Sequence, residues 1–170
     1  MKKALLFWFC LSLLSCGFHL RGAYQLPPQM QRTHILADIK PGVLLQRLQR
    51  TLLDNQIQLV ETADNANVIL HLYNEKIIRR IVSVDGQGRA QEYAITYQLS
   101  FELNSVADAL PAADEISIKA QTLSLQKSYL FDPEDVLGKA REEQLLINDM
   151  QKDMLRLILL QLQLKATPVT

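Results

Sequence analysis

The stretch YAITYQLSFELN, residues 93–104, is the part of the sequence that decides the fold. Large apolar residues occupy every second position, and small or polar residues lie between them. Because successive side chains of a strand point to opposite faces, this period of two predicts a strand with one apolar and one solvated face. A sheet built from such strands is covered on one side only.

Further strands are predicted on both sides of this stretch. Residues 67–84 precede it and are rich in leucine, isoleucine and valine. The link DGQG, residues 85–88, predicts a β-hairpin, because Asp-Gly supplies the positive φ that tight hairpin turns need. A third strand starts at Ile116, and its apolar positions change phase by Leu123, which predicts a bulge.

Two amphipathic helices complete the set of elements. Pro41 begins the first, a helix of about fourteen residues in which leucines recur at spacings of three and four. The last helix opens at Asp132, which can cap it, with Pro133 at the first helical position. Its apolar stripe continues to about Lys165.

The order of these elements predicts the fold class. Residues 33–39 form a short strand before the first helix, so the order is β-α-β-β-β-α. We expect an α+β fold, a two-layer sandwich in which two helices pack on one face of a four-stranded, mostly antiparallel sheet.

The N-terminus has the features of an export signal. Lys2 and Lys3 precede an apolar run, residues 4–14, that is too short to span a bilayer, which needs about twenty residues. The run ends in Leu-Leu-Ser-Cys16, a lipobox. We therefore expect residues 1–15 to be removed as a lipoprotein signal peptide. Cys16 is then expected to carry an S-diacylglycerol group on its thiol and an N-palmitoyl chain on its amino group.

An acylated cysteine determines where the protein lies. Several acyl chains make membrane attachment effectively permanent, and Gly17, where an aspartate would signal inner-membrane retention, favours the outer membrane. Residues 16–30 contain a Pro-Pro pair and are predicted to be a lipidated, extended tether. Residues 31–165 are predicted to be the folded domain, and residues 166–170 a short tail.

The composition excludes several classes of function. The 18 basic and 18 acidic residues balance, so no basic excess indicates nucleic-acid binding. His19, His34 and His71 have no Cys or second His at metal-ligand spacing, and no serine lies in a nucleophile-elbow context. No metal, cofactor or catalytic residue is therefore predicted.

Basic residues gather at two places in the sequence. One group flanks the predicted hairpin and the other begins the last helix: Lys76, Arg79, Arg80 and Arg89, and then Lys139 and Arg141. Such residues can bind phosphate groups through charge-assisted hydrogen bonds, or they can be ordinary surface charge. The composition alone leaves both interpretations open.

Four segments resemble one known family. They are CGFHLRG (residues 16–22), VLLQRLQRTLLDNQIQLVE (43–61), DGQGRAQEYAITYQLSFEL (85–103) and FDPEDVLGKAREEQLLINDM (131–150). Over most of residues 16–162 the chain resembles the LptE family of lipopolysaccharide-assembly lipoproteins. The resemblance implies the two-layer fold, and a domain that sits as a plug inside a large outer-membrane β-barrel, LptD. It also implies that the pair delivers lipopolysaccharide (LPS) to the cell surface.

The resemblance further implies where LPS binds. Family contacts involve basic residues at the hairpin tip and at the start of the last helix. Lys139 matches the second position and Arg89 is the candidate for the first, with Arg79 and Arg80 as further candidates on the hairpin.

The expected protein is thus a non-enzymatic lipoprotein, anchored at the periplasmic face of the outer membrane, that assists LptD assembly and binds LPS. A generic lipoprotein adaptor of another envelope complex and a periplasmic hydrolase are the alternatives.

Overall fold

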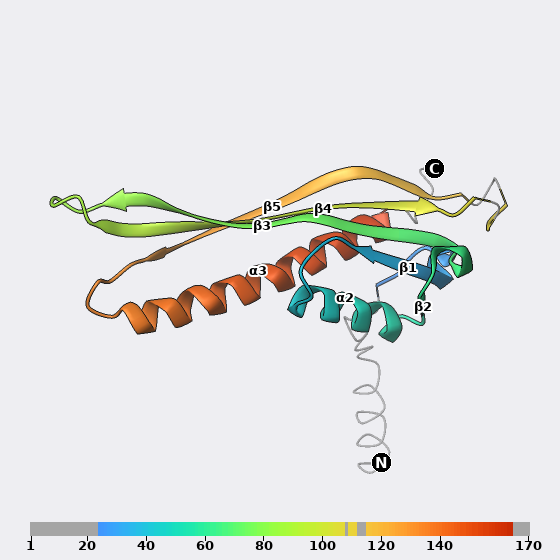
Figure 1. Ribbon diagram of the computed structural model, residues 1–170, viewed down its shortest axis with the longest axis horizontal. Helices are drawn as coiled ribbons and strands as arrows, with labels where there is room; N and C mark the ends of the chain where they lie inside the picture. Colours follow the sequence, from blue (N-terminus) through green and yellow to red (C-terminus); the bar gives the residue numbers. More distant parts are fainter. Residues whose placement is uncertain (1–23, 108, 112–114, 165–170) are drawn as a thin grey trace, which may run out of the picture.

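The described part of the chain forms a mixed sheet covered by two helices (Figure 1). The computed structural model describes residues 24–107, 109–111 and 115–164. In chain order the elements are η1 (Pro28–Gln31), β1 (Arg32–Ala37), α2 (Val43–Asp54), β2 (Gln58–Val60), η2 (Ala63–Asn65), β3 (Val68–Val84), β4 (Ala90–Ser105), β5 (Ser117–Leu130) and α3 (Val136–Leu164). The α+β, two-layer expectation is confirmed.

The expectation of a four-stranded, mostly antiparallel sheet is corrected. The sheet has five strands in the order β2-β1-β3-β4-β5 and is mixed. β1 pairs in parallel with both β2 and β3, whereas the β3–β4 and β4–β5 pairs are antiparallel. β2 was missed because its three residues are too short to show a period of two. Its parallel pairing with β1 follows from the helical crossover through α2.

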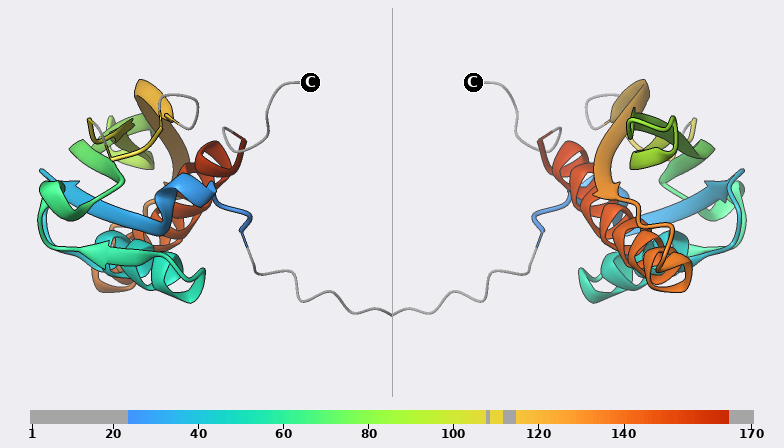
Figure 2. Two further views of the ribbon diagram at one scale, coloured as in Figure 1. Left: turned by 90° about the vertical axis from the view of Figure 1, so that its right-hand side faces the viewer. Right: turned by 90° about the vertical axis from the view of Figure 1, so that its left-hand side faces the viewer.

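The stretch that decides the fold forms the centre of the core. Its large alternate residues on β4, from Ile95 to Leu103, are each at most 1% exposed and face the helices. Both helices lie on this side of the sheet (Figure 2). They contribute the leucines of α2 and the methionines of α3, among them Leu44, Leu48, Leu52, Met150 and Met154.

The molecule is elongated, and different elements form its two ends. The turn between β3 and β4 projects at one end, and the start of α3 lies at the same end (Figure 1). β1, β2 and α2 lie toward the other end. The 29 residues of α3 give a helix roughly 44 Å long, so it runs along much of the sheet. We call the region of the β3–β4 turn and the start of α3 the hairpin end.

The register of the sheet shifts at four places, three in the β3–β4 pair and one in the β4–β5 pair. In β5 an extra residue lies between Ile118 and Gln121, so the bulge predicted from the phase change is confirmed. A second bulge, which the sequence did not predict, lies in β3 between Tyr73 and Lys76 and contains Asn74 at φ 56°. An extra residue reverses the alternation of side chains. Leu72 therefore faces the helices before the bulge, and the odd-numbered residues from Glu75 to Ile81 face them after it, up to the next register shift.

The last helix begins later than predicted. It starts at Val136 rather than Pro133, because the cap is Asp135 and not Asp132. The Asp135 carboxylate Oδ1 accepts a hydrogen bond from the Gly138 N–H at 3.0 Å. The Asp132 carboxylate instead accepts one inside the turn that precedes the helix. Aspartate satisfies a free N–H at either place, and only the geometry of the turn selects between them.

The segments on either side of β1 also differ in detail from the prediction. α2 begins at Val43, two residues after Pro41. Residues 24–30, expected to be part of an extended tether, end in the short helix η1, and Met30 is completely buried in the core. The folded part therefore includes residues before position 31.

Some expectations lie outside the described residues. These are the signal peptide, the lipidated Cys16, and the tail, residues 166–170. Within the described ranges, no helix combines the length and apolar character that crossing a membrane requires.

Candidate functional site

The hairpin turn holds Arg89 through Asp85. The Asp85 carboxylate Oδ1 accepts the N–H groups of Gln87 and Arg89 at 2.9 Å each, and its Oδ2 accepts Arg89 Nε at 2.8 Å. Gly88 adopts φ 79°, a conformation that glycine adopts without strain. The hydrogen bonds from the Arg89 N–H and guanidinium lower the pKa of Asp85. Arg89 remains 64% exposed, so a ligand can reach it.

Lys139 lies in the first turns of α3, also beside a carboxylate. Its Nζ lies 2.8 Å from Glu142 Oε2, three residues further along the helix. The Lys139 side chain is only 22% exposed, while Glu142 is half exposed. A phosphate group that binds Lys139 must therefore compete with Glu142 for the ammonium group.

Arg79 joins the hairpin to α3. It lies on β3, and its Nη1 donates to Glu143 Oε2 of α3 at 3.0 Å. The same carboxylate oxygen accepts the hydroxyl of Tyr129 from β5 at 2.5 Å. The Arg79 guanidinium also stacks on the ring of Tyr93 from β4, 4.6 Å from its centroid. Burial and the hydrogen bond to Glu143 raise the pKa of Tyr129 to about 12, so Tyr129 donates at physiological pH.

Arg80 lies on the opposite face of the sheet. Consecutive residues of a strand alternate, so Arg79 faces α3 while Arg80 faces away from it. There the Arg80 Nη2 donates to Gln126 Oε1 of β5 at 3.0 Å. The four sequence-predicted LPS-binding residues therefore do not form one pocket. They are distributed around the hairpin and the start of α3.

Exposed apolar side chains surround these cations. They lie on the far half of β3, at the end of β5 and on the first half of α3, and all are about half exposed or more: Ile77, Ile78, Ile81, Val82, Val84, Leu130, Val136, Leu137 and Leu145. Large apolar side chains that gather beside charged ones usually mark a binding surface. The hairpin end thus presents both apolar and cationic groups.

His71 lies in a separate polar cluster on the uncovered face. Its Nε2 lies 2.8 Å from Asp38 Oδ2 and its Nδ1 3.2 Å from Glu102 Oε1. Desolvation lowers the pKa of His71, but the two carboxylates outweigh it and the net shift is upward. Among the described residues no group of three or more His, Cys, Asp or Glu side chains is arranged to hold a metal ion.

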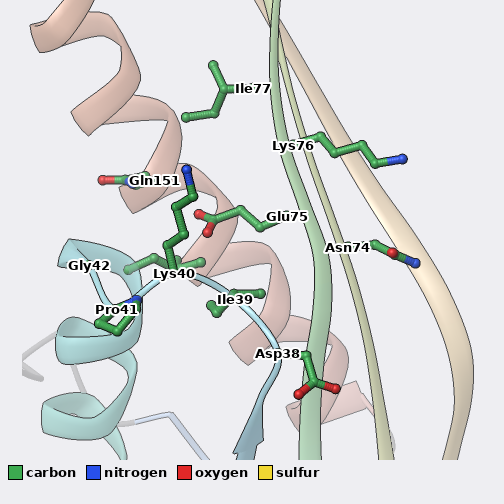
Figure 3. Close-up of a pocket in the computed structure, with 11 residues that line it drawn as sticks. Asp38, Ile39, Lys40, Pro41, Gly42, Asn74, Glu75, Lys76, Ile77 and Gln151 are labelled. Carbon is green, nitrogen blue, oxygen red and sulfur yellow. The ribbon is translucent and has the colours of Figure 1, made fainter.

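A half-open cavity of about 680 Å³ lies between the β1–α2 connection, β3 and α3 (Figure 3). Glu75 and Ile77 point into it from β3, and Lys76 points to the other side of the strand. Glu75 accepts the hydroxyl of the buried Tyr97 at 2.6 Å. On the α3 side, the buried Oε1 of Gln151 has no hydrogen-bond donor in the described part of the chain.

The sequence reasoning missed the contact that joins the two elements. From the sequence alone, Glu142 and Glu143 lie on a helix among Lys139 and Arg141, a pattern typical of a solvated face with ion pairs, and only Glu142 fits that expectation. Glu143 instead holds Arg79 and Tyr129 across to the sheet. The local signal was its spacing: Glu143 lies four residues before the partly buried Ile147, on the stripe that faces the sheet.

Solved structures share this fold. One is the rare lipoprotein B of Shewanella oneidensis, with 23% identity, a TM-score of 0.61, and coverage of 76% of this chain and 91% of that one. Another is an uncharacterized lipoprotein B of Nitrosomonas europaea, with 29% identity, a TM-score of 0.65, and coverage of 86% and 90%.

Comparison of the sequence with known proteins also finds bacterial lipoproteins. The LPS-assembly lipoprotein LptE of Photorhabdus laumondii is 23% identical over 147 residues, which are 86% of this chain and 76% of that protein. The family model described as LptE, lipopolysaccharide-assembly, matches residues 34–162. These residues run from β1 to the last turns of α3, so the match covers nearly the whole described fold. The chain therefore belongs to the LptE family of lipopolysaccharide assembly.

Proposed function

We propose that this protein is the lipoprotein subunit of an outer-membrane LPS translocon. In this proposal Cys16 carries the lipid anchor at the periplasmic face of the outer membrane. The folded domain sits in the LptD β-barrel, assists the assembly of that barrel, and binds LPS during delivery. Membership of the LptE family supports an assembly role rather than an enzymatic one, so a periplasmic hydrolase is no longer an alternative.

The observation that carries the proposal is the mixed character of the hairpin end. LPS has acyl chains next to phosphate groups, and the hairpin end has exposed isoleucine, valine and leucine side chains next to Arg89 and Lys139. A charge-assisted hydrogen bond contributes roughly 1.5–3 kcal/mol, and less where the group is exposed. Each cation alone is therefore a modest contributor, and the apolar contacts supply the remainder.

The internal partners of the cations refine this proposal. Arg89 is held by Asp85, and Lys139 by Glu142, so both cations are already positioned before a ligand arrives. Pre-positioning reduces the entropy lost when a phosphate binds. It also means that the phosphate must displace the carboxylate from the cation or share the cation with it, which limits the gain in affinity.

Binding of the purified full chain to LPS tests the proposal. We expect Arg89→Asp combined with Lys139→Asp to weaken binding by about tenfold, equivalent to roughly 1.4 kcal/mol. Lys152→Asp is the control, since Lys152 lies on the same helix and also pairs with a carboxylate three residues away, that of Asp149, but outside the hairpin end. Equal affinity of the double variant and the control, with unchanged circular dichroism, would contradict the proposed LPS site.

A further inference from the structure

The far half of β3 is an unpaired sheet edge. β1 pairs with β3 only as far as Leu72, where the Asp38 N–H donates to the Leu72 carbonyl at 2.8 Å. The chain then turns away through Pro41 into α2. From Asn74 to Val84, β3 is paired with β4 on one side, and no strand of the described residues lies on its other side.

This edge carries apolar side chains on both of its faces. Ile77 and Ile81 lie on the helix face and Ile78 lies on the opposite face, because the bulge at Asn74 sets the alternation, while Val82 lies at a further register shift between Ile81 and Ser83. These four side chains are 47–55% exposed. A long edge strand with unpaired N–H and C=O groups and apolar flanks is a template for adding another strand. Native proteins usually protect such an edge from pairing. An unprotected edge of this length therefore favours the binding of a partner strand.

The cavity lies where β1 leaves this edge. Its walls are the β1–α2 connection, residues Asn74 to Ile77 of β3, and Gln151 of α3 (Figure 3). It therefore occupies the space that β1 would fill if it continued along β3. The buried Gln151 Oε1 on its wall lacks a donor among the described residues, and an incoming backbone N–H or side-chain donor would satisfy it.

The charge on the edge defines the occupant. Residues 76–84 contain Lys76, Arg79 and Arg80 and no acidic residue. Lys76 and Arg80 lie on the same outer face, four residues apart, while Arg79 is already paired with Glu143. Like charges opposite each other destabilise a strand pair, so a second copy of this edge, running antiparallel about its middle, fits poorly. Neither Lys76 nor Arg80 is paired with a carboxylate in the described part of the chain, so glutamates four residues apart on an incoming strand would face both cations.

We propose that an extended segment of a partner protein, with apolar residues on one face and carboxylates on the other, adds to the β3 edge from Lys76 to Val84. It becomes a sixth strand of the sheet, and one of its ends fills the cavity beside Gln151. Main-chain hydrogen bonds supply the affinity, and the two glutamate–cation pairs supply the register. The partner is defined by this chemistry alone, so the proposal does not rest on LPS binding.

Amide hydrogen exchange of the full chain in detergent micelles, resolved by residue, tests this inference. The probe is the acetylated and amidated peptide Thr-Val-Glu-Val-Thr-Val-Glu-Val-Thr, with its glutamates spaced as Lys76 and Arg80 are. At about 1 mM peptide, we expect the amides of Lys76–Val84 that point away from β4 to exchange roughly tenfold more slowly. The control peptide carries N-methyl groups on its central consecutive amides, which removes its donors, and it is expected to give no slowing.

Charge variants separate strand addition from general adhesion. Lys76→Glu with Arg80→Glu is expected to abolish the slowing. Lys119→Glu with Lys152→Glu changes the net charge equally, away from this edge, and is expected to retain it. The inference is overturned if the probe slows none of these amides or if the N-methylated peptide slows them equally. It is also overturned if these amides are already slow without peptide, whether or not the slowing depends on protein concentration, because the chain itself or a second copy then covers the edge.

Discussion

Glu143→Ala tests whether the hydrogen bonds from Arg79 and Tyr129 of the sheet to Glu143 of α3 stabilise the packing of this helix on the sheet. The substitution removes a carboxylate that accepts the Tyr129 hydroxyl at 2.5 Å and the Arg79 guanidinium at 3.0 Å. Tyr129 is only 6% exposed, so its hydroxyl loses a partner in a nearly dry position. A hydrogen bond to a charged group contributes about 1.5–3 kcal/mol. The half-exposed Arg79 adds less than about 1 kcal/mol.

We therefore expect Glu143→Ala to lower the free energy of unfolding by about 2 kcal/mol. With a typical urea dependence, this moves the unfolding midpoint down by about 1 M. The matched control is Glu142→Ala, because Glu142 is the neighbouring residue on the same helix and, among the described residues, forms an ion pair with Lys139 alone. Its expected cost is about 0–0.5 kcal/mol.

The measurement is urea unfolding of the full chain, followed by circular dichroism. A double-mutant cycle with Tyr129→Phe isolates the hydroxyl contact, and the two changes together are expected to cost less than the sum of their separate effects. If Glu143→Ala and Glu142→Ala cost the same, or if the cycle is additive, the reasoning about these hydrogen bonds is refuted.

Two further predictions concern His71 and Gly138. Because Asp38 and Glu102 raise the pKa of His71, its stabilising contribution is complete below its ordinary pKa of 6.5 and is lost as pH rises through the raised value. The stability advantage of the native chain over His71→Gln, measured by urea unfolding, is therefore expected to shrink from pH 6 towards pH 8, and an advantage that grows would contradict this. Gly138→Ala normally stabilises a helix by about 1 kcal/mol, but here the added Cβ would overlap the capping carboxylate of Asp135. We expect no gain in the thermal midpoint, and a clear rise would show that the cap is not needed.

The features that the sequence predicted well are those with a local signal. The alternation over residues 93–104 requires only that neighbouring residues point to opposite faces, and β4 has the predicted apolar face. The hairpin at residues 85–88 and the bulge in β5 were also visible as local patterns. In each case the free energy that selects the conformation comes from residues close in the chain.

The features that were missed depend on contacts far apart in the sequence. β2 exists because it pairs with β1, across the crossover that contains α2. The bulge at Asn74 has no marker that separates it from an ordinary strand position, yet it determines that Glu75 and Ile77 face the helices. The residues next to Glu143 indicate only a solvated helix face, because its partner Arg79 lies 64 positions away in the sequence.

The four sequence-predicted cations do not share one surface. Arg89 and Lys139 both lie at the hairpin end, as the order of elements implied. Their assignment as LPS contacts stays a prediction. Arg79 is occupied by Glu143, and Arg80 faces the other side of the sheet, so these two are weaker candidates for the same ligand.

The most direct test of the central claim is purification of the native protein from detergent-solubilised outer membranes, followed by mass spectrometry of everything that accompanies it. The proposed function predicts a large β-barrel protein in equal amount, and an N-terminal peptide that begins at an acylated Cys16. A different envelope partner would favour the adaptor alternative. Recovery of the chain without any barrel protein, or in a water-soluble fraction with residues 1–15 still attached, would contradict the account.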